Sequence, residues 1–88
     1  MSDMKNAELR FPVECALRVI YDQSAANVPA AAEAVLRRHG MGETWTPGRS
    51  SAGGRYLTLG VTVTMPDRAA LEAIPAELAA IPGVRMVL

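Results

Sequence analysis

Hydrophobic and polar residues alternate most regularly between Arg55 and Met65. Every second residue of this stretch is aliphatic, and the intervening positions are mainly threonine. A period of two sends alternate side chains to opposite faces of a β-sheet, and β-branched Val and Thr suit a pleated surface. The pattern predicts a central strand with one aliphatic face for helices to cover and one open face. The aliphatic set is Leu57, Leu59, Val61, Val63 and Met65.

Two further stretches alternate in the same way and predict strands at Glu14–Tyr21 and Val84–Leu88. The first directs Cys15, Leu17, Val19 and Tyr21 to the core. The second directs Val84, Met86 and Leu88 to the core, and Arg85 and Val87 to the open face. A short, irregular strand is expected around Thr44–Ser50. Because Pro47 cannot donate to a β-ladder, that strand must lie at a sheet edge or contain a bulge.

Two helices are predicted by apolar residues at a spacing of three and four. The helix at Asn27–His39 has Pro29 in its first turn and Gly40 after its last, both typical of helix ends. The helix at Asp67–Ala80 carries Leu71, Ile74, Leu78 and Ile81 on one face. Pro75 lies inside it and removes one backbone hydrogen bond, so a kink or interruption is expected between Leu71 and Pro75.

The order of elements is βαββαβ. With right-handed crossovers this order predicts an α+β fold, the ferredoxin-like sandwich, in which two helices cover one face of a four-stranded antiparallel sheet. Residues 1–10 lack periodicity and are predicted to form a flexible N-terminal arm. Residues 11–88 are predicted to form a single ferredoxin-like domain.

Composition narrows the classes of partner. The 88 residues include nine basic and nine acidic side chains, so no net charge attracts DNA or an anionic membrane. The single cysteine, Cys15, cannot form an internal disulfide, which is typical of a reducing compartment. No apolar run resembles a signal peptide or a membrane span. We expect a cytoplasmic protein.

One candidate ligand site or partner-binding site lies in the loop between the second and third strands. A glycine-containing turn can aim backbone N–H groups at an anion or peptide while an arginine supplies a bidentate fork. The alternative is a plain hairpin turn, which selects serine and glycine for backbone reasons alone. The residues of this candidate site are Arg49, Ser50, Ser51, Gly53 and Tyr56.

A second candidate is the open face of the sheet, predicted to be a contact surface for a protein partner. It includes apolar side chains that no helix covers. Homodimerisation is the simplest use of such a patch. The predicted contact residues are Arg18, Ile20, Thr58, Gly60, Thr62 and Val87.

No pattern predicts catalysis, a metal or a cofactor. His39 has no second histidine, cysteine or carboxylate cluster at ligand spacing, and it fits a helix C-terminal cap beside Arg37 and Arg38. Cys15 is expected in the core rather than exposed as a nucleophile. The loop Tyr21–Ser24 holds an aspartate where phosphate chemistry needs a cationic cradle. We therefore expect a protein that is not an enzyme.

Several local features together resemble the small bacterial YbeD-like proteins of uncharacterised function. These features are Phe11-Pro12, Arg38-His39, Ser50-Ser51, Gly53-Gly54, Tyr56 and the terminal Val84–Leu88. The resemblance implies a fold similar to the ACT regulatory domains. The chain departs from the ACT pattern, because the loop after its first strand lacks the glycine with which ACT domains approach a ligand.

The function expected from this resemblance is regulatory or adaptor, through binding a protein partner or a small ligand. The alternative is an RNA-binding module that uses the open face. RNA recognition on a sheet needs aromatic platforms, and this face offers only Tyr56 among threonines.

Overall fold

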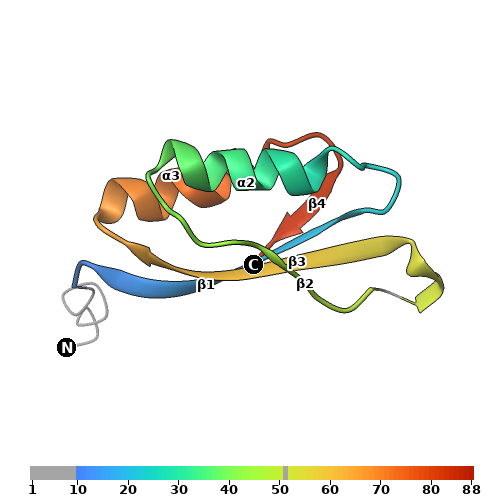
Figure 1. Cartoon of the computed structure of the whole chain (residues 1–88), viewed down its shortest axis with the longest axis horizontal. Coiled ribbons are helices and arrows are strands. Elements are labelled where there is room, and N and C mark those ends of the chain that lie inside the picture. Colours follow the sequence, from blue (N-terminus) through green and yellow to red (C-terminus); the bar gives the residue numbers. More distant parts are fainter. Residues whose placement is uncertain (1–9, 51) are drawn as a thin grey trace, which may run out of the picture.

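The computed structural model describes residues 10–50 and 52–88. Its strands and helices are β1 (Val13–Asp22), α2 (Val28–Arg38), β2 (Thr46–Pro47), β3 (Tyr56–Met65), α3 (Arg68–Ala79) and β4 (Val84–Val87), with a short 3₁₀ turn η1 (Ala52–Gly54) before β3. The strands form one antiparallel sheet in the order β2-β3-β1-β4. Both helices lie on the same side of it (Figure 1). The predicted α+β, ferredoxin-like fold is confirmed. Of the predicted N-terminal arm, only Arg10 lies within the described residues.

The two alternating strands β1 and β3 form the centre of the sheet. They pair along their whole length, from Val13 opposite Met65 to Asp22 opposite Tyr56. Their aliphatic faces point toward the helices, as the period of two predicts. Cys15 is half-buried and packs against the core on this side.

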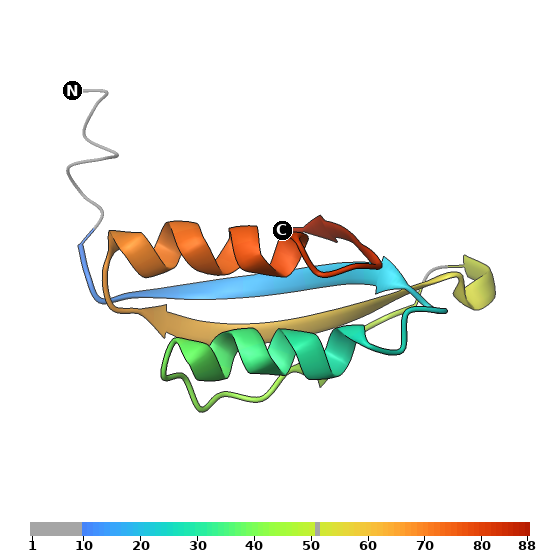
Figure 2. The same ribbon diagram turned by 90° about the horizontal axis from the view of Figure 1, so that it is seen from above.

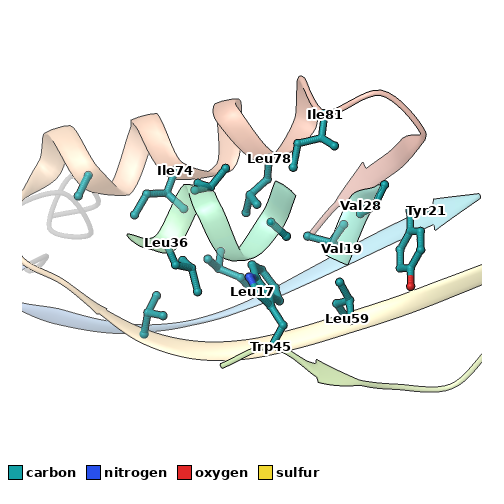
Figure 3. Close-up of a cluster of buried hydrophobic side chains, with 14 of the residues drawn as sticks. Leu17, Val19, Tyr21, Val28, Leu36, Trp45, Leu59, Ile74, Leu78 and Ile81 are labelled. Atoms are coloured by element: carbon teal, nitrogen blue, oxygen red, sulfur yellow. The ribbon is translucent and has the colours of Figure 1, made fainter. Parts of the chain in front are cut away.

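The core fills the space between the helices and the sheet (Figure 3). Each helix contributes an apolar stripe, with Val28, Ala32, Val35 and Leu36 from α2 and Ala70, Ile74 and Leu78 from α3. Trp45 also belongs to this cluster and is only 8% exposed. The sequence analysis missed it because Trp45 lies in an irregular stretch without periodicity.

The helix ends follow local backbone chemistry. Gly40, at φ 76°, ends α2. Its N–H bonds to the Arg37 carbonyl, and the Met41 N–H bonds to the Leu36 carbonyl, the pairing of a Schellman motif. At the start of α3 the Asp67 carboxylate accepts a hydrogen bond from the Ala70 N–H at 2.9 Å, as expected of an N-cap.

β2 is an edge strand, as Pro47 required. It is short and pairs only with β3, Thr46 opposite Gly60 and Pro47 opposite Leu59. Gly48 extends the pairing by donating its N–H to the Thr58 carbonyl at 2.8 Å. This contact brings the chain after β2 close to the middle of the sheet.

β4, at the other edge, contains a β-bulge that the sequence did not reveal. Ile20 pairs with Met86, whereas its neighbour Tyr21 pairs with Val84. Arg85 is therefore an extra residue on β4. Because a bulge adds one residue, it reverses which side chains after it face the core.

Of the kink or interruption predicted between Leu71 and Pro75, the interruption is wrong. Helix α3 runs unbroken through Pro75, and Figure 2 shows it as one continuous helix. Ile74 and Leu78 on either side are fully buried, and Leu71 is half-buried. Packing of these anchors on the sheet offsets a lost hydrogen bond that costs about 3 kcal/mol in an isolated helix.

Candidate functional site: the open face of the sheet

The open face is the side of the sheet opposite the two helices (Figure 1). Alternation sends Arg18 and Ile20 of β1 to this side, together with Thr58, Gly60 and Thr62 of β3. Arg18 pairs with Gly60, and Ile20 pairs with Thr58, so these residues are direct neighbours across the two strands. Arg18 and Thr62 are exposed, while Ile20 and Thr58 are half-buried.

The exposed apolar part of this face comes from β4. Met86 pairs with Ile20, and the backbone of Leu88 exchanges hydrogen bonds of 2.8 and 3.1 Å with Arg18. Met86 is 51% exposed and Leu88 58%. Within the described part of the chain, these are the exposed large hydrophobic side chains. The sequence analysis had assigned both to the core.

Val87 does not belong to the open face, and its predicted position is wrong. It pairs with Val19 and packs against the core. The bulge at Arg85 is the physical reason, because it shifts Val87 inward and turns Met86 and Leu88 outward. Strict alternation along β4 cannot show such a shift.

A hollow of about 570 Å³ occupies the middle of the open face. Its lining combines one cation, Arg18, with small, polar and aliphatic residues, and includes Ala16, Thr46, Gly60, Thr62 and Leu88. A Cβ added at Gly60 would meet only the Leu17 carbonyl oxygen, at an ordinary 3.8 Å. A side chain would fit at Gly60, so its absence leaves the surface open.

A second hollow of about 390 Å³ lies on the other side of Arg18. It is lined by Arg18, Ile20, Gly48, Arg49 and Thr58. A Cβ added at Gly48 would lie 3.4 Å from the Thr58 Cγ2, at the lower end of ordinary van der Waals contact, so the chain passes close to β3 here. The close approach places Arg49 on the open face near Arg18.

The structure divides the predicted hairpin site. Arg49 joins the open face, and the exposed Ser50 follows it. Ser51 lies outside the described residues. Gly53 lies in η1 at φ 80° and lines neither hollow. Tyr56 lies farther along the open face, where the guanidinium carbon of Arg85 is 5.6 Å from its ring centroid.

Charge on the open face is balanced at one end and unbalanced at its centre. Near Tyr56, the Asp22 carboxylate accepts hydrogen bonds from the Ser24 hydroxyl (2.7 Å) and N–H (2.9 Å). These bonds lower the pKa of Asp22, and Arg85 and Arg55 lower it further. Within residues 10–50 and 52–88, in contrast, neither Arg18 nor Arg49 forms an ion pair.

The Arg38-His39 pair belongs to the helical layer, away from the open face. Arg38 bonds to one Glu77 oxygen at 2.9 Å, and the His39 Nε2 lies 3.0 Å from the other. The hydrogen bond with His39, and next the one with Arg38, lower the pKa of Glu77. These contacts join the end of α2 to α3. The sequence predicted a capping role, but it could not show Glu77 as the partner.

The described residues contain no group of three or more histidine, cysteine, aspartate or glutamate side chains placed to hold a metal ion. None of the helices in the described ranges has the length and apolar character needed to cross a membrane.

Fold and site define a ferredoxin-like domain with an uncovered sheet face. The chain belongs to a family described as "Protein of unknown function (DUF493)", whose profile matches residues 6–88. It is 34% identical over 89 residues to a UPF0250 protein of Shewanella sediminis and 36% identical over 90 residues to one of Chromobacterium violaceum. Each comparison covers 100% of both chains. The YbeD-like resemblance predicted from the sequence is confirmed.

Two solved structures share the fold. Protein HP0495 of H. pylori matches with a TM-score of 0.81 at 15% identity, covering 100% of this chain and 93% of that one. The C-terminal domain of the MgtC protein of Mycobacterium tuberculosis matches with a TM-score of 0.61 at 24% identity, covering 91% and 88%. At these identities the comparisons establish the fold.

Proposed function

We propose that this protein is a small cytoplasmic regulatory or adaptor protein without enzymatic activity, which holds a protein partner on the open face of its sheet. One observation carries the proposal. Met86 and Leu88 are exposed on the side without helices, next to Ile20 and Arg18. Apolar side chains gathered on an uncovered face are typical of a contact surface.

The same surface could instead hold a second copy of the chain or a small ligand, and each of these occupants has its own test. A second copy of the chain would bury the patch symmetrically. Sedimentation at rising protein concentration identifies this case. A small ligand in one of the two hollows would use the same residues, and would leave Met86 and Leu88 exposed.

RNA binding is the alternative function. Sheets that read RNA stack bases on aromatic side chains. On the described part of the open face, Tyr56 is the aromatic residue, and Arg85 already packs over it. Binding to RNA would weaken steeply with salt, because counterions compete for the phosphates. A salt titration with single-stranded RNA therefore separates the two functions.

Affinity capture from a native bacterial lysate tests the proposal. The intact chain is compared with a variant that carries Arg18→Ala and Thr62→Lys, and with the control Arg37→Ala on the exposed side of α2. We expect the intact chain and the control to retain the same partner and the double variant to lose it. Equal capture by all three would contradict the proposal.

A further inference from the structure

The two hollows of the open face have a one-sided charge. Arg18 lies between them and lines both, and Arg49 lines the smaller one. No acidic side chain of the described residues lines either hollow. The protein as a whole has equal numbers of acidic and basic groups. The local positive charge is therefore a property of this surface rather than of the composition.

We propose that the open face binds an acidic, extended segment of a protein partner, with a carboxylate of that segment held between Arg18 and Arg49. This inference rests on the proposed function and specifies the chemistry of the partner. Arginine presents a planar fork of donors that matches a carboxylate. The Thr58 side chain lines the same hollow and adds a hydroxyl.

The apolar residues beside Arg18 predict how far apart the acidic and aliphatic residues of the partner segment lie. Ile20 lies two residues from Arg18 on the same face of β1, and Met86 lies opposite Ile20. Two residues of a strand span about 6.6 Å. An extended segment also presents every second side chain to one side, at the same spacing. The segment that fits has an acidic residue, one residue of any kind, and then an aliphatic residue.

A carboxylate on a protein fits this surface better than the phosphates of RNA. Nucleotide bases need stacking platforms, whereas Ile20, Met86 and Leu88 offer aliphatic contact. Aliphatic groups are what a protein segment brings beside its carboxylates. Charge and apolar area therefore both favour the acidic segment.

The test is a titration of the full chain followed by backbone amide NMR. The probe is a short peptide that repeats the order glutamate, serine, leucine, serine. The comparison probes are the same peptide with glutamine in place of glutamate, and oligouridylate. We expect the glutamate peptide to shift amides around Arg18, Thr58 and Gly60, and the glutamine peptide to bind much more weakly.

Variants locate the carboxylate. Arg18→Gln and Arg49→Gln should each weaken binding about fivefold, as expected for a hydrogen-bonded but solvent-exposed charge pair. The matched control Arg37→Gln removes the same charge from α2 and should leave the affinity unchanged. Thermal melts of all three variants show whether the fold is intact.

Three results would overturn the inference. The first is equal affinity for the glutamate and glutamine peptides. The second is a loss of affinity with Arg37→Gln as large as with Arg18→Gln or Arg49→Gln. The third is no shift of open-face amides at millimolar peptide. Tighter binding of oligouridylate at the same amides would replace it with RNA recognition. If lysate capture depends on Arg18 and Thr62 while the peptide does not bind, the acidic partner is wrong and the proposed function stands.

Discussion

At the scale of single residues, Gly60 and Gly83 are glycines for different reasons. Gly60 lies on the open face, where an added Cβ would have room. Gly83 turns the chain into β4 at φ 97°, and an added Cβ would lie 2.3 Å from the Ala25 Cβ. A side chain at Gly83 would therefore destabilise the fold, whereas Gly60 leaves space on a surface.

This contrast predicts opposite effects of alanine. Gly60→Ala should raise the free energy of unfolding by about 0.5–1 kcal/mol, because glycine weakens a strand interior. Gly83→Ala should lower it by more than about 1 kcal/mol, through backbone strain and the clash. Urea unfolding followed by circular dichroism measures both. A destabilising Gly60→Ala would mean that a residue other than glycine does not fit there.

Trp45 combines a large buried surface with an unpaired donor. Its Nε1–H is buried and has no hydrogen-bond partner among the described residues. Trp45→Ala should cost about 3–5 kcal/mol of stability through the cavity it leaves. Trp45→Phe should cost much less, because it also removes a buried donor whose lack of a partner costs about 1–3 kcal/mol. Urea unfolding followed by circular dichroism compares them, and equal losses would contradict this account.

At the scale of elements, Pro75 shows where local preference fails as a guide. The sequence reveals both the lost hydrogen bond and the apolar anchors Ile74 and Leu78, but not that packing of these anchors keeps α3 continuous. The free energy gained by packing the helix on the sheet is larger than the local cost of the proline, so the helix stays continuous.

Pro75→Ala should therefore stabilise the protein. It restores a donor for the Leu71 carbonyl in a helix that is already continuous, and the expected gain is about 1–3 kcal/mol. The melting temperature is the measurement. Ala76→Gly, at the next and exposed position, is the control and should destabilise the helix by about 1 kcal/mol. A lower melting temperature for Pro75→Ala would show that α3 depends on the proline.

The contacts between Glu77, Arg38 and His39 predict how the pairing of α2 and α3 depends on pH. The pKa of Glu77 is lowered in the folded protein. Its contribution to stability is therefore complete above its unfolded pKa and is lost as the pH falls through the lower, folded pKa. Glu77→Gln should melt at a lower temperature than the intact chain at neutral pH.

This difference in melting temperature should shrink as the pH falls below 4.5, the ordinary pKa of a glutamate, and then disappear. Glu72→Gln is the matched control, since Glu72 is exposed on the same helix. It forms no ion pair within the described ranges. If the melting temperature of Glu77→Gln differed from that of the intact chain by the same amount at every pH, the effect would come from packing rather than charge.

At the scale of the whole molecule, periodicity predicts the fold and about half of the candidate site. Alternation along β1 and β3 identifies which side chains face away from the helices, because those strands pair without a bulge. The same reasoning fails on β4, where the register depends on one extra residue. The position of Arg49 depends on how closely Gly48 approaches Thr58, and the sequence pattern around Gly48 does not predict that distance.

The central claim is that the open face is covered in the cell, and the methionines of the chain report on it. Met86 is 51% exposed, whereas Met65 is fully buried. Peroxide oxidises exposed methionine sulfur first. The oxidation rate of Met86 in the purified chain is therefore compared with its rate after the chain has bound its partner in a native lysate.

Mass spectrometry of the recovered chain gives the extent of oxidation at each methionine, with Met65 as the buried reference. The account predicts rapid oxidation of Met86 in the purified chain and at least severalfold protection in the lysate. It also predicts that Arg18→Ala with Thr62→Lys abolishes the protection. Equal oxidation of Met86 in both settings would contradict the claim that this face is a contact surface.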